Sequence, residues 1–386
     1  MIEKFRYVSY AQEIIFGAGS LPRLGEAVNR FGWQRLLLCT NRSMQAAGNI
    51  EAIKAALGDR LVAVFDHVQP HVQDVQVQEV LALTGEHGVD AVIGLGGGSP
   101  IGMAKAVASA LEEKHNGRPA RAAFPTDQPL VPVIAIPTTY AGSEMTAVYG
   151  VTHTRENPPR KVTVNDPKIV PKLVIYDPQL TLDLPPEMTA STGINALAHC
   201  IEALYSITRH PMSTSAAIEG IRNMNNALLR CYTQGDDLGA RTEMLKGAHL
   251  AGLSLASVSM GLHHGLCHVL GGSSNVPHGI ANSIILPHAI RFNADVTAPE
   301  LIPAVAAMGI STNEFNPIMA VEAMEKKIFE LTGEMNLPQR LRDAGVGLQE
   351  SDLPRLAQLA FQNRSVQNNP KPITEEQLET LLRNAW

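Results

Sequence analysis

Short apolar runs alternate with longer mixed stretches over the first half of the chain. Buried strands are predicted at residues 35–39, 61–65, 91–95, 131–136 and 174–178, and residues 5–16 alternate apolar and polar as a strand or hairpin does. Helical patterns lie between these runs, as at 20–30 and 74–87. Strands that helices cover on both faces are apolar throughout, so the pattern predicts a parallel, doubly wound sheet.

Strand signals nearly vanish after Leu184. Glycine, proline and polar breaks separate predicted helices at 187–208, 213–231, 239–260, 262–270, 280–292, 299–308, 317–332, 336–343, 351–363 and 374–384. The expected fold class is therefore α/β plus all-α, with a Rossmann-like parallel-sheet domain over residues 1–184 and a helical domain over 185–386. A cleft between two such domains is a usual place for an active site.

A glycine-rich run, Gly94-Leu95-Gly96-Gly97-Gly98-Ser99-Pro100, follows one predicted strand and precedes a helix. Glycine lets the backbone approach a ligand closely, and Ser99 as N-cap with Pro100 behind it suits a helix start whose free N–H groups favour a phosphate. The spacing is not the ordinary dinucleotide fingerprint, and a tight turn alone is the alternative. The place after a parallel strand favours pyrophosphate binding by Gly96, Gly97, Gly98 and Ser99, and hence a dinucleotide-binding domain.

Polar residues also follow the strand predicted at 131–136. Thr138, Thr139, Gly142 and Ser143 come directly after it. In an open α/β sheet, residues at the carboxyl ends of strands lie in the ligand crevice, so these four are cofactor-binding candidates. A polar loop closed by hydroxyl turns is the alternative.

Asn41 ends the second strand, where an acidic residue would bind a ribose 2′-hydroxyl and reject a 2′-phosphate. Asn41 lacks that charge and Arg42 adjoins it, so both NADH and NADPH are expected to bind. Lys161 is a further cofactor-binding candidate, although most lysines in such a charged stretch are solvated surface groups. Residues 112–129 are polar and contain proline, which predicts a surface loop.

Histidines cluster in the second half of the chain. His264 and His268 stand four residues apart and share one helical face, and the double glycine at 271–272 is expected to end that helix before His278. Asn195 and His199 repeat the four-residue spacing. Capping or core histidines are the alternative for any single one, but so many imidazoles together need partners, which indicates a polar site.

Composition excludes several classes of protein. The chain has 386 residues, a formal net charge of −6 and 5% aromatic residues, a balance that argues against nucleic-acid binding. No signal peptide and no apolar run long enough to span a membrane is recognised, so no membrane partner is expected. The four cysteines show no paired spacing, which favours a reducing, cytoplasmic location.

Ordered motifs along nearly the whole chain resemble the iron-containing (group III) alcohol dehydrogenase superfamily. The matching residues are Gly96-Gly97-Gly98-Ser99, Pro137-Thr138-Thr139, Gly142-Ser143-Glu144, Gly193-x-Asn195-Ala196-Leu197-x-His199, His264-x-x-x-His268 and Pro277-His278-Gly279. The resemblance implies the fold shared with dehydroquinate synthase: an N-terminal dinucleotide-binding domain and a C-terminal helical domain. It also implies a homodimer.

Within that superfamily the chain looks most like the maleylacetate reductases. The similar residues are Pro137 to Glu144, Gly102, Asn195, His263-His264 and Asn368-Asn369-Pro370-Lys371-Pro372. Such enzymes reduce the activated double bond of maleylacetate with NADH or NADPH and give 3-oxoadipate in aromatic catabolism. One departure is Gly265, where the reductases usually carry lysine.

The resemblance also bears on metal binding. Metal-dependent members have aspartate where this chain has Asn195 and Gly102. Losing a ligand charge weakens metal affinity, so no metal is the favoured expectation. If Fe²⁺ or Zn²⁺ does bind, the expected ligands are His199, His264 and His278, with Asn195 as a weak fourth.

The favoured chemistry is hydride transfer from a nicotinamide to a small substrate with a carbon–carbon double bond conjugated to a carbonyl. His264 and His268 are the candidates for stabilising the resulting oxyanion and delivering a proton, while His199, Asn195 and His278 complete the polar site. Three alternatives stay open: a metal-dependent alcohol dehydrogenase or aldehyde reductase, a lyase resembling dehydroquinate synthase, and a non-catalytic binding protein.

Overall fold

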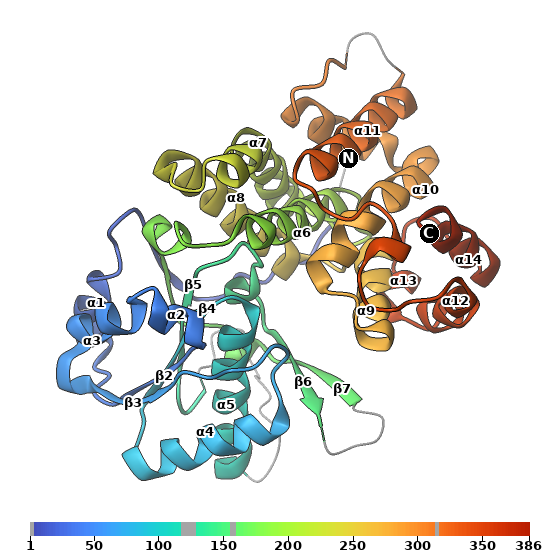
Figure 1. The fold of residues 1–386 in the computed structure, drawn as a ribbon. Coiled ribbons are helices and arrows are strands. Elements are labelled where there is room, and N and C mark those ends of the chain that lie inside the picture. Colours follow the sequence, from blue (N-terminus) through green and yellow to red (C-terminus); the bar gives the residue numbers. More distant parts are fainter. Residues whose placement is uncertain (1–3, 117–128, 155–159, 313–315) are drawn as a thin grey trace. The chain divides into compact units, whose positions relative to one another are not determined.

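The structure is a computed structural model that describes residues 4–116, 129–154, 160–312 and 316–386. The chain divides into two compact units (Figure 1). Val8–Leu184 form an α/β unit, and Pro185–Trp386, joined by the described residues before Val8, form a helical unit.

The α/β unit is built on a six-stranded sheet with the order β1-β8-β5-β4-β2-β3. All neighbouring strands pair in parallel, so the predicted parallel sheet is confirmed. The strands are β1 (Glu13–Phe16), β2 (Leu36–Cys39), β3 (Leu61–Phe65), β4 (Ala91–Gly96), β5 (Val133–Pro137) and β8 (Leu173–Tyr176). The stretch at 5–16 becomes a strand only over its last four residues.

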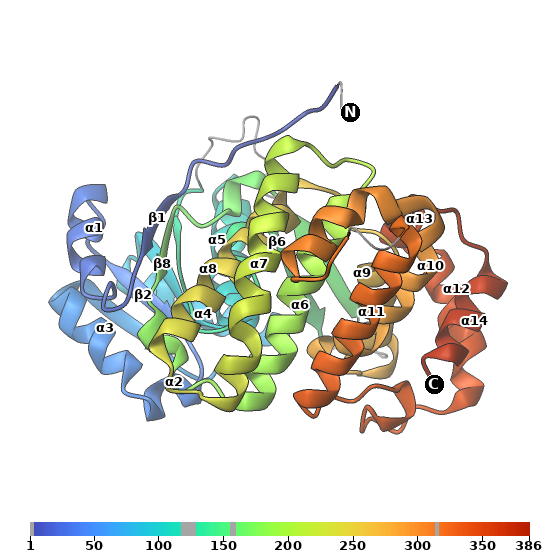
Figure 2. The same ribbon diagram turned by 90° about the horizontal axis from the view of Figure 1, so that it is seen from above.

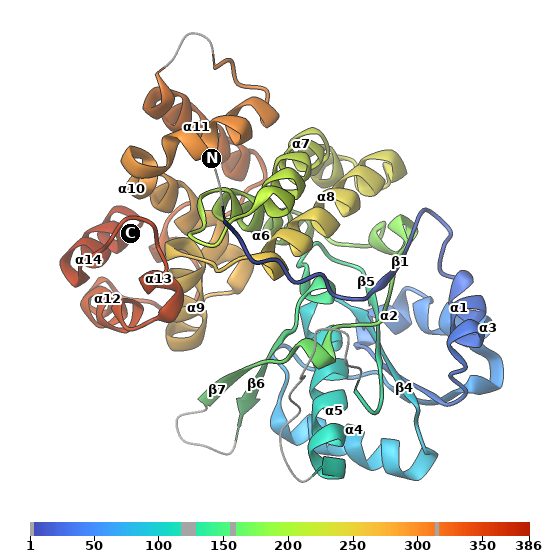
Figure 3. The same ribbon diagram turned by 180° about the vertical axis from the view of Figure 1, so that it is seen from behind.

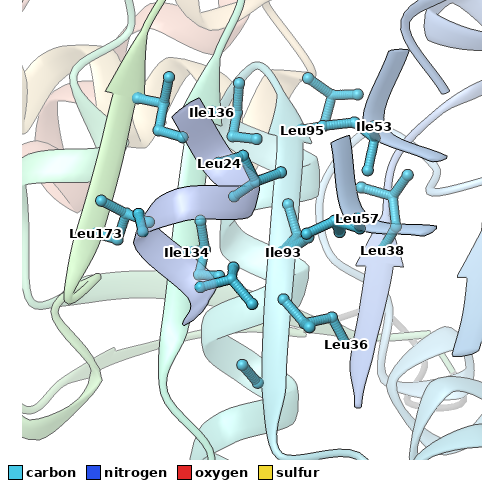
Figure 4. Packing of buried hydrophobic residues seen from close by; sticks show 14 of the residues in the cluster. Leu24, Leu36, Leu38, Ile53, Leu57, Ile93, Leu95, Ile134, Ile136 and Leu173 are labelled. Atoms are coloured by element: carbon cyan, nitrogen blue, oxygen red, sulfur yellow. The ribbon is translucent and has the colours of Figure 1, made fainter. Parts of the chain in front are cut away.

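Helices cover both faces of this sheet. Leu36 and Leu38 of β2 point to one face and pack with residues of α1 (Arg23–Phe31) and α3 (Asn49–Leu57), as Figure 4 shows for Leu24, Ile53 and Leu57. Leu37 and Cys39 point to the other face, toward α4 (Asp74–His87) and α5 (Gly98–Asn116). Because alternate side chains enter two different cores, every position of the strand is apolar.

A topological switch point lies between β2 and β4. The chain leaves β2 to form β3 on one side, and it then returns to form β4 on the other side of β2. Loops that leave two adjacent parallel strands in opposite directions create a crevice at the strands' carboxyl ends. Asn41 and the glycine-rich run therefore follow the two strands that border this crevice.

The helical unit contains α6 (Pro186–Tyr205), α7 (Pro211–Thr233), α8 (Leu238–Ser257), α9 (Leu262–Ser274), α10 (His278–Ala307), α11 (Pro317–Glu334), α12 (Leu353–Phe361), α13 (Arg364–Gln367) and α14 (Glu375–Asn384). Helices α6, α7 and α8 pack side by side (Figure 2), and α10 packs against α6, α9 and α11. Among the described residues no helix combines the length and the apolar character needed to cross a bilayer.

Several predicted boundaries are wrong. The helices expected at 280–292 and 299–308 are one helix, α10, with three prolines inside it. Helix α9 continues past the double glycine to Ser274 and ends at Asn275, whose φ of 55° supplies the left-handed cap. The helix expected at 336–343 is only a 3-10 turn at Leu341–Asp343.

The α/β unit also holds an antiparallel hairpin that was not predicted. Its strands are β6 (Val148–His153) and β7 (Arg160–Asn165), and β6 contacts α5 (Figure 3). Of the loop expected at 112–129, residues 112–116 continue α5, and 117–128 lie outside the described residues.

Candidate active site

The cofactor-binding candidates of the α/β unit gather at the ends of adjacent strands. The Thr138 N–H donates to the Gly96 carbonyl at 3.1 Å, which continues the pairing of β5 with β4. A Cβ added to Gly97 would lie 3.1 Å from the Cγ2 of Thr139. The two polar strand ends predicted from sequence are therefore neighbours, and glycine is what lets them approach.

Helix α5 starts two residues earlier than predicted. Gly98 is its first residue, so Ser99 lies inside the first turn and is not the N-cap. The Ser99 hydroxyl instead accepts the N–H of His71 at 3.2 Å. A Cβ on Gly98 would meet no atom within 4 Å, so open space lies in front of the helix start, where a phosphate would be favoured.

Asn41 caps α2 (Arg42–Ala46) by accepting the Met44 N–H at its side-chain oxygen. Gly142 takes a φ of 77°, which turns the loop after β5 at a conformation that suits glycine. Ser143 follows it, and its carbonyl accepts the buried Lys105 ammonium at 2.5 Å. Lys161 lies in β7, but its side chain is outside the part of the molecule that the structure describes.

The histidines of the helical unit form a row. His199 of α6 and His264 of α9 have nearly parallel rings with centroids 4.7 Å apart. The ring of His268 lies 6.5 Å from that of His264, and His278, the first residue of α10, lies 5.7 Å beyond His268. His199 and His264 are buried, whereas His268 is exposed and His278 half-buried.

Glu202 contacts two of the histidines in this region, although it is not among the candidate site residues predicted from the sequence. Its Oε2 lies 2.6 Å from Nδ1 of His264, and its Oε1 accepts the His263 N–H at 2.9 Å. Glu202 stands three residues after His199 in α6, so helical spacing alone placed both on one face. His263, directly before His264, donates from Nε2 to the Asn282 carbonyl at 3.3 Å. Nε2 must carry the proton because a carbonyl oxygen can only accept a hydrogen bond.

Burial disfavours the charged form of each of these groups. It lowers the pKa of both His263 and His264 to about 3, with the neighbouring imidazoles acting in the same direction. Burial likewise holds the pKa of His199 well below its usual range. It raises the pKa of the Glu202 carboxyl, although the backbone N–H groups around that carboxyl oppose the shift. Burial therefore disfavours charge on both Glu202 and His264, and the two side chains share one proton in their 2.6 Å contact.

Several buried polar atoms of this cluster have no hydrogen-bond partner. In the described part of the chain they include Oδ1 of Asn195, Nδ1 of His199 and Nε2 of His264. An unmade hydrogen bond costs about 1–3 kcal/mol, so three such atoms on two facing helices indicate a place for a ligand.

A metal ion fits these residues poorly. Among the described residues, the one set of His, Cys, Asp and Glu whose ligand atoms gather within 4.8 Å is Glu202, His263 and His264, and these already bond to one another. His199, His264 and His278 do not form such a set. Asn195 offers a neutral oxygen where a carboxylate would add charge, and buried divalent ions depend on that charge.

A parallel sheet with polar strand ends at its switch point is typical of nucleotide-binding proteins, and the helical unit adds a row of imidazoles. The chain belongs to the iron-containing alcohol dehydrogenase family. The family model "Iron-containing alcohol dehydrogenase" matches residues 11–178, and "Fe-containing alcohol dehydrogenase family, C-terminal" matches 189–386. It is an NAD(P)-dependent oxidoreductase.

Known proteins of two kinds resemble the chain over its full length. The maleylacetate reductase of Burkholderia cepacia is 35% identical over 382 residues, which cover 99% of this chain and 97% of that protein. The crystal structure of maleylacetate reductase from Agrobacterium tumefaciens matches with a TM-score of 0.84 and 32% identity, covering 100% of this chain and 98% of that one. A 1,3-propanediol oxidoreductase matches with a TM-score of 0.91 and 28% identity over 100% of both chains.

Proposed function

We propose that this protein reduces maleylacetate, or a 2-enoic keto acid like it, with NADH or NADPH during the breakdown of aromatic compounds. The product from maleylacetate is 3-oxoadipate. The observation that carries the proposal is Asn195, a neutral buried amide in the place of a metal-binding carboxylate, within a chain that is 35% identical to a maleylacetate reductase.

The reaction adds a hydride from the nicotinamide to the double-bond carbon that is β to the ketone. The electron pair of the double bond then moves toward the carbonyl and leaves an enolate, which takes a proton at the α carbon. Stabilising that enolate in a site without water is usually the largest catalytic contribution. The protein must therefore supply a hydrogen-bond donor and a proton.

The Glu202–His264 pair meets both needs. With the proton between them on Glu202, the neutral imidazole of His264 carries its own proton on Nε2, the atom left without a partner. Nε2–H donates a hydrogen bond to the enolate oxygen, and its proton then passes to the α carbon as the ketone re-forms, while Nδ1 takes the proton of Glu202 and leaves that residue as a carboxylate. The Nδ1 atom of His263 lies 3.2 Å from Nδ1 of His264 and accepts a second hydrogen bond from the proton now on that atom. This bond stabilises the pair after Glu202 has lost its proton.

The other members of the row orient the substrate and return the proton. His199 and Asn195 each carry a buried polar atom without a partner, and these atoms bind the polar ends of the substrate. His268 and His278 are more exposed and connect His264 with solvent, so they re-protonate the pair after each turnover. No step of this reaction needs a metal ion, and we propose that the enzyme turns over without one.

The polar strand ends of the α/β unit bind the cofactor. The start of α5 at Gly97 and Gly98 receives the pyrophosphate, and the threonines after β5 contact the phosphates and ribose. Asn41 carries no charge against a 2′-phosphate, which supports use of both NADH and NADPH. The active form is a homodimer in the cytoplasm in this proposal, and its partners are small molecules.

A metal-dependent alcohol dehydrogenase is the second candidate, which the full-length match with a 1,3-propanediol oxidoreductase favours. A panel of maleylacetate, other 2-enoic keto acids, simple aldehydes and 1,3-propanediol, followed by nicotinamide absorbance, separates the two. The proposal predicts turnover with the keto acids in the presence of a chelator. Oxidation of the diol that requires Fe²⁺ or Zn²⁺, with no reduction of maleylacetate, would instead establish the second candidate.

A further inference from the structure

Helix α9, which carries the reactive histidine, has no N-terminal cap of its own. Gly261 precedes the helix and offers no side chain. The first N–H groups of any helix lack intrahelical acceptors, and buried ones need a partner from elsewhere. Two distant side chains supply them: Oε1 of Glu202 accepts from His263, and Oδ1 of Asn369 accepts from Leu262 at 3.4 Å.

Both polar side-chain atoms of Asn369 form hydrogen bonds. Its amide forms a reciprocal pair with Asn293 of α10, with donor–acceptor distances of 3.0 and 2.7 Å. The remaining N–H donates to the Lys371 carbonyl at 2.7 Å. With the bond from Leu262, the amide uses two acceptor sites and two donors, which is its full capacity. A buried polar group that is satisfied in this way specifies one geometry.

The same segment is fixed at both of its ends. Lys371 donates to the Phe292 carbonyl and to the Asp295 carboxylate, each at 2.9 Å, which ties the segment to α10. Before Asn369, α13 packs directly on α9 (Figure 3), so closely that a Cβ on Gly265 would lie 2.9 Å from the Val366 nitrogen. The stretch 363–371 therefore contacts α9 immediately before and after the two buried histidines.

We infer that Asn369 is a positioning residue for His264: by capping Leu262 it places the first turn of α9 so that His264 meets Glu202. The inference rests on the proposed function, because it assigns the residue to that reaction. Asn369 does not touch the reacting atoms. Misplacement of a catalytic group by about 1 Å can cost about 100-fold in rate, so a modest shift of this turn is enough to matter.

The test compares Asn369→Ala with Lys371→Met, which loosens the same segment without removing a bond to α9. At saturating NADH and maleylacetate, Asn369→Ala is expected to lose about 10- to 100-fold in kcat. Its KM for NADH is expected to stay near the wild-type value, and the pH profile of kcat to shift because the Glu202–His264 contact changes. Lys371→Met is expected to lose thermal stability and to keep kcat. Wild-type kcat in folded Asn369→Ala would overturn the inference.

A second readout does not depend on activity. Nitrogen NMR of the imidazoles, assigned with His264→Gln, reports which ring atoms of His264 carry protons. Asn369→Ala is expected to change the His264 signals and Lys371→Met to leave them unchanged. If Asn369→Ala does not fold, Asn293→Ala loosens the same amide pair and is expected to shift these signals in the same direction. Unchanged His264 signals in the folded variant would overturn the inference even if maleylacetate is not the substrate.

Discussion

The Nδ1 atom of His264 lies 2.6 Å from Oε2 of Glu202, and both side chains are buried. Burial disfavours charge on both groups, and a contact this short is a hydrogen bond with one proton between the two atoms. In the proposed reaction this pair stores a proton, and Nε2 of His264, which has no partner in the structure, delivers it.

Glu202→Gln tests this proton store. The glutamine oxygen can still accept from His263, but its NH₂ group then faces Nδ1 of His264 and cannot hand over a proton. We expect kcat to fall by about 100-fold, within the range of a lost acid–base contribution, while the KM values change little. Steady-state kinetics with circular dichroism as a folding control make the measurement. A variant that keeps wild-type kcat would show that the proton reaches the substrate by another route.

Asn195→Asp tests the proposal that the neutral amide of Asn195 keeps the site from holding a metal ion. The substitution restores a carboxylate beside His199 and His264, so we expect the variant to retain Zn²⁺ or Fe²⁺ after dialysis, whereas the wild type does not. Maleylacetate reduction by the wild type should be unaffected by a chelator. Elemental analysis and activity before and after chelation decide the matter. Loss of wild-type activity on chelation, restored by added metal, would contradict the account.

The buried histidines make stability depend on pH. The pKa of His263 and of His264 is about 3 in the folded protein, against about 6.5 in an unfolded chain. Between these values the unfolded chain binds more protons, so the free energy of unfolding falls as the pH is lowered from 6.5 toward 3, by about 1.4 kcal/mol per pH unit for each residue. The raised pKa of Glu202 acts in the opposite direction, from pH 4.5 up to the pKa that the carboxyl has in the folded protein.

Urea unfolding between pH 4 and 8 measures this dependence. His263→Gln keeps a donor for the Asn282 carbonyl and removes one titrating group, so its unfolding free energy should fall less steeply with acidity than that of the wild type. Equal slopes for the two proteins would mean that His263 is not held neutral by burial.

Asn41→Asp tests the choice of cofactor. Aspartate preserves the cap on α2 and adds the charge that repels a 2′-phosphate. We expect kcat/KM for NADPH to drop by about 10- to 100-fold while that for NADH is kept, because the added carboxylate disfavours the 2′-phosphate that only NADPH carries. The ratio of the two kcat/KM values in the wild type should stay below about 10³. An unchanged ratio in the variant would mean that the ribose of the cofactor does not lie beside residue 41.

Local pattern predicted the sheet and the histidine row correctly because each depends on short-range periodicity. The apolar runs at β2 and β4 and the helix at 74–87 follow from residues that are neighbours in sequence. The four-residue spacing of His264 and His268 similarly fixed their common face.

Features that depend on distant partners were not predictable in this way. Helix α10 continues through Pro299 and Pro303 because α6, α9 and α11 pack around it, which outweighs the local preference to break. The cap on α9 comes from residues 202 and 369, far away in sequence. Among these features, only Glu202 could have been found from the sequence, because it lies three residues after His199 in the same helix.

The most direct test of the central claim is the reduction of maleylacetate by metal-free protein, with wild type and His264→Ala measured side by side through NADH absorbance. The account predicts that the wild type turns over without metal and that kcat of the variant is about 10²- to 10⁴-fold lower. Comparable turnover by the two proteins would contradict it.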